Sequence, residues 1–256
     1  ECLLKSVRSL ETGAYHFHLP KFDGKSEAEL FDYIKEFKDD NIFAITELMR
    51  LGVSTSELHE KTAITEYFLI SIEKMVKMEK VIADNKGDVK VLKDAKVMGF
   101  SDKFIAKLWN MTEREVFDIR KKQNMFPVYR MVDTCHTNAY IPYFYSSYSG
   151  ENSSILTDKK KIVVLGAGPI RIGQGVEFDY STVHAVTTIK NSGYEAIIIN
   201  NNPETVSTDY TTADKLYFEP LTTEDVMNII EFEKPEGVIA SLGGQTAINL
   251  AQPLHD

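Results

Sequence analysis

The chain has 256 residues, of which 43% are hydrophobic and 26% charged, and its formal net charge at pH 7 is −9. This length is enough for one large domain or two modest ones, and the composition is that of an ordinary globular protein. No run of about 18 apolar residues occurs, so the sequence offers no candidate for a membrane-spanning helix.

Cysteine and histidine are too few and too scattered for a disulfide framework or a metal-binding pattern. The only close groupings are Cys135 with His136 and His16 with His18, and neither supplies four ligands. We therefore expect a reduced, cytoplasmic type of protein with no metal of its own. The first residues have neither an initiator Met nor the layout of a signal peptide, so we expect a piece from the middle of a longer polypeptide. A targeting peptide upstream stays an open alternative.

Charge is unevenly distributed along the chain. Residues 161–256 contain five Lys and Arg against thirteen Asp and Glu, a balance of −8, whereas residues 1–160 are nearly neutral. Affinity for nucleic acid comes mainly from Lys and Arg contacts with phosphates. The acidic second part therefore argues against a nucleic-acid-binding surface there.

Residues 26–124 have the periodicity of helices and no strand signal. Ser26 and Glu29 form a capping box at the start of the first helix, and Leu30, Ile34 and Phe37 are expected to share its apolar face. This pattern predicts an all-α domain.

Further helices are expected in the same region. One ends before Gly52, one begins at Ser54, and the longest covers the segment TEYFLISIEKMVKMEKVIADN. The segments SDKFIAKLW and TEREVFDIRKK complete the series, and the second of these opens with a Thr112–Glu115 capping box.

Residues 161–256 follow a different pattern, in which short apolar runs alternate with helical segments. The runs IVVLG, AIIIN, KLYF and GVIASLG are apolar on both faces, as strands of a covered parallel sheet are. Alternation of strand and helix predicts a doubly wound, Rossmann-like α/β domain. The segment before it is rich in Tyr, Ser and Asn and has no clear period, which is typical of a connector.

The loop GAGPIRIGQG follows the first of these strands and raises the question of a bound nucleotide. A dinucleotide fingerprint would require a glycine at the position of Arg171, and an acidic residue where Asn200 to Asn202 end the second strand. No Gly-Lys-Ser/Thr closes the loop, so it is not a Walker loop either. The alternatives that remain are a tight turn that merely needs glycine and a specialised turn for another ligand.

Three polar loops are expected to lie along one edge of this sheet, because the carboxyl ends of parallel strands meet there. An arginine among many oxygen-bearing side chains suits a small anionic or carboxylate-like ligand. The alternative is that these polar groups only satisfy one another. The candidate residues are Arg171, Gly173, Gln174, Gly175, Glu177, Asn202, Glu204, Thr205, Ser207, Thr208, Gly243, Gly244, Gln245 and Thr246.

Four segments give the chain a resemblance to a known family. GAGPIRIGQGVEFDY, NNNPETVSTDY, LYFEPLTTEDV and EKPEGVIASLGGQTAINLA resemble the large chain of carbamoyl-phosphate synthase, at the domain that opens its second, carbamate-phosphorylating half. Upstream, FPVYRMVDTCHTNAYIPYFYSSY resembles the connector of that family, and SVRSLETG resembles the end of its first half.

The resemblance implies four parts. Residues 1–24 would be the tail of the preceding ATP-grasp half, 25–135 an all-α oligomerisation domain, 136–160 a connector and 161–256 the α/β pre-ATP-grasp domain.

The resemblance also implies a function for the parent protein. The parent would be a ligase that makes carbamoyl phosphate, for arginine or pyrimidine biosynthesis, from bicarbonate, glutamine-derived ammonia and two ATP with Mg²⁺ or Mn²⁺. Its partners would be a glutamine amidotransferase subunit or domain and further large chains, with no nucleic acid and no membrane. The ATP-grasp machinery would lie outside these 256 residues, so the chain itself is expected to hold no catalytic residue and no tightly bound cofactor, and to be inactive alone. Its candidate residues would line one wall of the second active site or a passage to it.

Two other functions are compatible with parts of the pattern. The segment FSDKFIAKLWNMTEREVFDIRKKQ is that of a helix-turn-helix, which suggests a DNA-binding regulator with a nucleotide-sensing domain. However, Glu113, Glu115 and Asp118 in the would-be recognition helix would repel phosphates. A biotin-dependent carboxylase has a similar opening domain but no helical insert.

Overall fold

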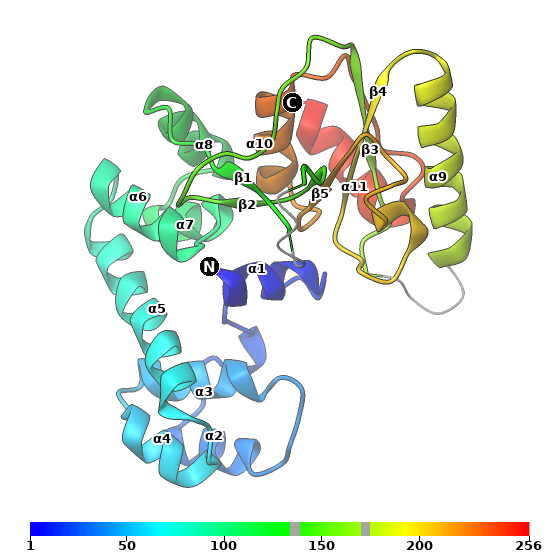
Figure 1. Ribbon diagram of the computed structural model, residues 1–256. Helices are drawn as coiled ribbons and strands as arrows, with labels where there is room; N and C mark the ends of the chain where they lie inside the picture. The colour runs from blue at the N-terminus through cyan, green and yellow to red at the C-terminus, as the bar shows by residue number, and fades with distance from the viewer. Residues whose placement is uncertain (134–138, 170–174, 256) are drawn as a thin grey trace. The chain divides into compact units, whose positions relative to one another are not determined.

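The structure is a computed structural model and describes residues 1–133, 139–169 and 175–255 (Figure 1). The chain divides into two compact units: Glu1–Val7 with Thr12–Gln123, and Arg8–Glu11 with Asn124–Asp256. No helix in the described ranges is both long and apolar enough to cross a membrane.

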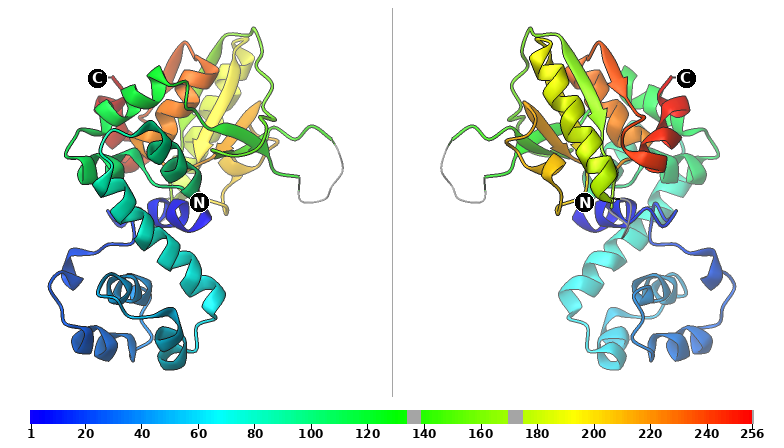
Figure 2. Two further views of the ribbon diagram at one scale, coloured as in Figure 1. Left: turned by 90° about the vertical axis from the view of Figure 1, so that its left-hand side faces the viewer. Right: turned by 90° about the vertical axis from the view of Figure 1, so that its right-hand side faces the viewer.

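The first unit is built of helices, as the sequence predicts. All of residues 12–123 are described and none of them is in a strand. The elements are α1 (Cys2–Ser9, whose last two residues belong to the second unit), η1 (Pro20–Phe22), α2 (Glu27–Ile34), α3 (Asn41–Arg50), α4 (Thr55–Thr62), α5 (Glu66–Asp84), α6 (Val89–Met98), α7 (Asp102–Trp109) and α8 (Glu113–Lys122). Helix α5 is the longest and contacts α3, α4, α6 and α7, and the turned views show it running between these helices (Figure 2).

Capping explains where several of these helices begin and end. Both expected capping boxes are present, and in α2 the amide of Ser26 donates to the carboxylate of Glu29 over 2.8 Å. The expected position of Phe37 is wrong. Helix α2 ends at Ile34, the side-chain amide of Asn41 donates to the carbonyls of Ile34 and Glu36, and the Phe37 side chain is 99% exposed.

A buried ionic cluster lies within the α6–α8 part of this unit. The guanidinium of Arg120 donates to both carboxylate oxygens of Asp102, and the ammonium of Lys96 lies 3.0 Å from the same carboxylate. All three side chains are at most 2% exposed. Trp109 is also buried, and its indole donates to the carbonyl of Ile82 over 2.7 Å.

The second unit is a six-stranded sheet in the order β1-β2-β5-β4-β3-β6. Strands β3 (Lys161–Leu165), β4 (Glu195–Asn200), β5 (Lys215–Phe218) and β6 (Gly237–Ile239) are parallel and alternate along the chain with α9 (Gly175–Asn191), α10 (Thr223–Glu233) and α11 (Gly244–His255). A short η2 (Val206–Thr208) follows β4. This arrangement confirms the doubly wound, Rossmann-like α/β fold.

Two strands lie where the sequence showed no period. Strand β1 (Val128–Met131) pairs antiparallel with β2 (Tyr143–Ser147), and β2 continues the sheet by pairing in parallel with β5. Strand β2 lies in residues 136–160, expected to be a plain connector, and β1 lies at the end of residues 25–135, expected to be all-α. Both therefore contribute to the edge of the sheet instead.

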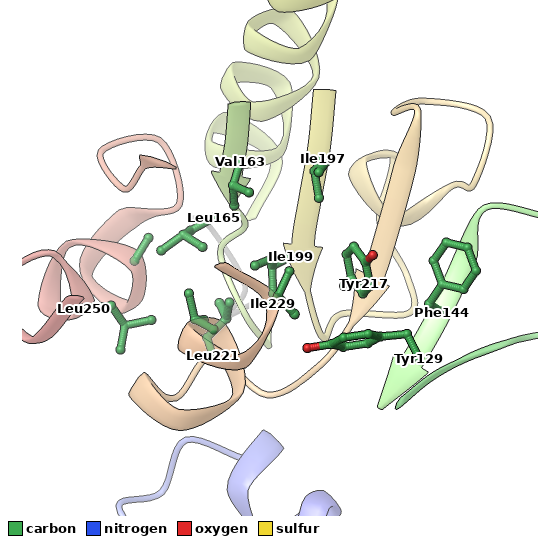
Figure 3. Packing of buried hydrophobic residues seen from close by; sticks show 12 residues of the cluster. Tyr129, Phe144, Val163, Leu165, Ile197, Ile199, Tyr217, Leu221, Ile229 and Leu250 are labelled. Atoms are coloured by element: carbon green, nitrogen blue, oxygen red, sulfur yellow. The ribbon is translucent and has the colours of Figure 1, made fainter. Parts of the chain in front are cut away.

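Alternate residues of the strands form two separate cores, as a sheet covered on both faces requires. Val163, Ile197 and Tyr217 point to the face covered by α10 and α11 (Figure 3). Val164, Ile198 and Leu216 point to the other face and pack with residues of α9. The sheet thus holds its carboxyl edge between two layers of helices.

Charged side chains are buried at the opposite, amino edge of the same sheet. Lys215 at the start of β5 lies 2.7 Å from the carboxylate of Glu233 and 3.6 Å from that of Glu195 at the start of β4. The hydroxyl of Tyr217 also bonds to Glu233, and burial together with that carboxylate raises the pKa of Tyr217 well above 10.0. This cluster joins strands and helix α10 at the edge away from the candidate site.

Candidate functional site

The candidate site lies at the carboxyl edge of the parallel strands. Strand β3 is the first of the four in the chain, yet β4 lies on one side of it and β6 on the other, so the strand order reverses beside β3. In open α/β sheets, ligands bind outside the carboxyl ends of the strands at such a reversal. The loops after β3 and β6 are therefore the natural walls of a binding site.

Glycines bring these two loops into direct backbone contact. A Cβ added to Gly243, in the loop after β6, would lie 2.1 Å from the carbonyl oxygen of Gly166 in the loop after β3. A Cβ on Gly244, at the start of α11, would lie 2.8 Å from the ring of Phe178 in α9. Only residues without a side chain allow this approach. The glycines thus set the distance between the loops and the first turns of α9 and α11.

Asn200, at the end of β4, joins two of the loops. Its side chain is 1% exposed, and its amide oxygen accepts from the backbone N–H groups of Gly168 and Asn201, each over 3.0 Å. Its amide nitrogen lies 3.3 Å from the hydroxyl of Ser207. Asn200 ends the second strand of the domain, where a dinucleotide-binding domain has an acidic residue, and here its side chain holds the glycine loop through the N–H of Gly168.

The loop after β4 is also tied to α9. The amides of Val206 and Ser207 donate to the two carboxylate oxygens of Asp179 over 3.1 and 3.0 Å. Within the loop, the hydroxyl of Thr208 donates to the carbonyl of Asn202, whose side chain accepts from the amide of Glu204. These bonds leave Glu204 itself exposed at the surface of the loop.

Glu11 enters this site from the other end of the chain and was not among the residues expected there. Its carboxylate accepts from the hydroxyl of Thr246 over 2.8 Å, in the first turn of α11. It also lies against Gly168, where an added Cβ would be 2.2 Å from the carboxylate. The N-terminus of a helix carries partial positive charge and attracts anions. The chain's own carboxylate thus lies at the start of α11, beside the glycine loop.

Arg8 and Ser9 strengthen the attachment of this segment. The carbonyl of Ser9 accepts from the side-chain amide of Asn201 over 3.0 Å, and the guanidinium of Arg8 lies 3.5 Å from Asp225. Burial lowers the pKa of Arg8, but Asp225, Glu224 and further acidic neighbours outweigh that effect and raise it. The segment RSLETG shows no periodic pattern that could have placed it beside the sheet.

The residues expected at the site fall into three groups. Arg171, Gly173 and Gln174 lie outside the described residues. A second group is buried at the starts of helices or in the loops and consists of Gly175, Asn202, Ser207, Thr208, Gly243 and Gly244; Thr205 and Thr246 are half-buried. Glu177, Glu204 and Gln245 are exposed, and the Gln245 side chain turns along α11 toward Asn249, 2.6 Å away. Within the described ranges, no three or more His, Cys, Asp or Glu come together as a metal site would require.

Comparison with protein families gives two matches, one for each part of the chain. Residues 158–256 match the carbamoyl phosphate synthase preATP-grasp domain. Residues 1–124 match the carbamoyl-phosphate synthetase large chain oligomerisation domain. The chain belongs to the carbamoyl-phosphate synthase large chain family. Members of this family are ligases that use ATP and metal ions.

The two matches agree with the architecture of this synthase chain. The oligomerisation-domain match covers the helical unit, which ends at Gln123, and the preATP-grasp match opens just before β3. Strands β1 and β2 lie between the two matched ranges. The family identification expected from the sequence is confirmed.

Proposed function

We propose that the chain is part of a synthase that makes carbamoyl phosphate from bicarbonate, glutamine-derived ammonia and two ATP with Mg²⁺ or Mn²⁺. In this proposal the second unit supplies one wall of the carbamate-phosphorylating site, and the helical unit mediates assembly with other chains. The observation that carries the proposal is the pair of family matches, with the oligomerisation domain first and the preATP-grasp domain second in the same chain. The close approach of the glycine loops at the carboxyl edge of the sheet supports it.

The proposed role of the wall is to line a passage for carbamate. Carbamate decomposes readily in water, so an enzyme that forms it in one place and phosphorylates it in another gains from a closed path. Gly175 is buried at the first position of α9. Glu177 in the first turn of α9 and Glu204 in the loop after β4 are both exposed and would offer hydrogen-bonding groups along such a path.

The loops have the rigidity that a lining requires. Asn200 fixes the glycine loop through the amide of Gly168, and Asp179 fixes the loop after β4 through two further amides. Glu11 and Thr246 close the same edge beside α11. A wall held by buried hydrogen bonds keeps its shape while a small anion passes.

The proposal is tested by changing the size of residue 175 in the full-length synthase. We expect Gly175→Ala to be mild, and Gly175→Phe to keep the fold and bicarbonate-dependent ATP cleavage while carbamoyl phosphate formation falls at least about 100-fold, as for a steric block of one step. Gly237→Phe is the matched control, because Gly237 is exposed at the start of the edge strand β6 with nothing within 4 Å of an added Cβ.

Two results would count against the passage. If Ala and Phe at position 175 unfold the domain to a similar degree, the glycine serves a backbone requirement instead. If Gly175→Phe leaves both partial reactions and the overall synthesis unchanged, residue 175 does not face the path of carbamate.

A further inference from the structure

Glu11 occupies a backbone position that ordinarily takes glycine. Helix α1 ends at Ser9, and Glu11 follows two residues later with a φ of +52°, in the left-handed region. Glycine adopts this conformation at the end of a helix without steric cost, whereas a residue with a Cβ is strained there. Backbone strain of this kind persists where surrounding contacts hold the residue in place. The side chain of Glu11 is therefore expected to have a role that offsets the strain.

The side chain of Glu11 fills a space that Gly168 leaves open. A Cβ added to Gly168 would lie 2.2 Å from one carboxylate oxygen of Glu11, and Gly168 itself has a φ of +71°. The other carboxylate oxygen accepts from the hydroxyl of Thr246 over 2.8 Å. A single carboxylate therefore lies against both the glycine loop after β3 and the first turn of α11.

Hydrogen bonds hold the backbone beside Glu11 to the same loops. The carbonyl of Ser9 accepts from the side-chain amide of Asn201 over 3.0 Å. The backbone N–H groups of Asn201 and Gly168 both donate to the side-chain oxygen of Asn200. The contact between Gly168 and Glu11 closes these bonds into a ring that returns to Ser9. In such a ring of buried contacts, each member restricts the movement of the others.

Arg8 attaches the segment to α10 as well. Its guanidinium is buried and lies 3.5 Å from the carboxylate of Asp225, in the first turn of that helix. Removing a buried guanidinium from its carboxylate is costly, so the segment cannot shift easily along the sheet edge. The Glu11 side chain therefore extends from a backbone whose place is fixed by α10 and by the loop after β4.

We propose that Glu11 is a positioning residue of the second unit. Through the reach of its side chain and its hydrogen bond with Thr246, it holds the glycine loop at Gly168 at a fixed distance from the start of α11. This inference rests on the role proposed above for the same edge, and it adds a residue from the other end of the chain. Glu11 acts through these two neighbours and not on a substrate.

Native-state hydrogen exchange of the Gly168 amide in the 256-residue chain tests the positioning, with the amides of β4 as internal reference. Glu11→Ala and Glu11→Gly should both make this exchange at least about tenfold faster, as for the loss of one hydrogen bond. Glu11→Gln should stay within about threefold of wild type, because its amide oxygen can accept from Thr246. Glu236→Ala is the matched control, since Glu236 is exposed just before β6 and pairs with Lys160. It should leave the exchange unchanged.

The comparison of Ala with Gly at position 11 separates the side chain from the backbone. Gly relieves the strain of the positive φ and Ala does not, so Glu11→Gly should unfold at a higher urea concentration than Glu11→Ala. If the Gly168 amide exchanges rapidly in the Ala variant but normally in the Gly variant, backbone strain explains the effect and the inference is wrong. Equal exchange in Glu11→Gln and Glu11→Ala would also overturn it, because the hydrogen bond would then play no part.

The full-length synthase shows whether this positioning matters for the reaction. In Glu11→Ala we expect carbamoyl phosphate formation to fall about tenfold while bicarbonate-dependent ATP cleavage stays within about twofold, because a displacement of about 1 Å can cost up to about 100-fold in rate. Glu11→Gln should restore most of the synthesis. A residue needed only for folding would lower both reactions together, and that result would contradict the inference.

The exchange measurement distinguishes failure of this inference from failure of the proposed function. Unchanged exchange at Gly168 in Glu11→Ala would overturn the positioning, whatever the synthase variant does. Faster exchange together with unchanged synthesis would support the positioning and would count instead against the role proposed for this edge as a wall of the site.

Discussion

Removing the side chain of Asn200 is expected to loosen the glycine loop at a predictable cost in stability. In Asn200→Ala, the buried N–H groups of Gly168 and Asn201 lose their acceptor, and Ser207 loses the amide 3.3 Å away. A buried donor left unsatisfied costs about 1–3 kcal/mol. Two of them give a loss of about 2–5 kcal/mol in the free energy of unfolding, since water entering the space left by the side chain offsets part of the penalty.

Urea unfolding followed by far-UV circular dichroism measures this loss. With a denaturant slope of about 2.5 kcal/mol/M, the midpoint should fall by about 1–2 M. Hydrogen exchange at the Gly168 amide should become faster in the native state, because its acceptor is missing. Asn249→Ala is the matched control, since Asn249 is exposed on α11 and its amide oxygen accepts a hydrogen bond from the exposed Gln245. A change below about 0.5 kcal/mol in Asn200→Ala, or an equal change in Asn249→Ala, would refute the reasoning.

Two further predictions concern the helical unit. Asp102→Ala should lower the free energy of unfolding of this unit by about 3–5 kcal/mol. The buried guanidinium of Arg120 stays protonated and would be left without the carboxylate that it contacts through two hydrogen bonds. Urea unfolding followed by Trp109 fluorescence measures this loss, and a value below about 1 kcal/mol would contradict the prediction. Burial lowers the pKa of His16 below 6.5 in spite of its hydrogen bond with Glu79, so the unfolded chain binds more protons here. The contribution of neutral His16 to the free energy of unfolding is present above pH 6.5 and is lost as the pH falls below that value. We therefore expect the free energy of unfolding to fall less between about pH 7.5 and 5.5 in His16→Gln than in wild type. Parallel curves of stability against pH for the two proteins would show that His16 does not contribute.

Much of the fold was predictable because its signals are local. Capping boxes at Ser26 and Thr112 and the terminal Gly52 mark helix ends within four residues of the helices they bound. The four parallel strands are continuous apolar runs, which a sheet covered on both faces requires. Helix α6 was missed although Asp88 caps its start and Gly99 its end, because its apolar positions are interrupted by four lysine and aspartate residues in ten.

The two additional strands depend on partners far along the chain. Strand β1 has only four residues and includes a charged one, Arg130, so it lacks an apolar run. Strand β2 joins the sheet through β5, about seventy residues later. Such pairing is decided by long-range packing, which no window of sequence contains.

The site was predictable only in the part that follows from strand order. The loops after β3, β4 and β6 meet at one edge as expected, and glycines at 166 and 243 explain how closely they approach. Glu11 could not be predicted, because it is 235 positions away from Thr246, its partner. Whether the residues at this edge line a path for carbamate stays a prediction.

The segment Arg8–Glu11 gives the chain an unusual order of assembly. These four residues belong to the second unit, yet all of Thr12–Gln123 separates them from the rest of it. In sequence terms Thr12–Gln123, which is nearly all of the helical unit, is an insertion between two segments of the second unit. During synthesis Glu11 leaves the ribosome more than two hundred residues before Thr246, so the helical unit can fold while the sheet edge still lacks its last loop. Closing this long connection comes late and is slow relative to local helix formation. A second unit expressed from Asn124 onward would lack the carboxylate at the start of α11, however well its own sheet folds.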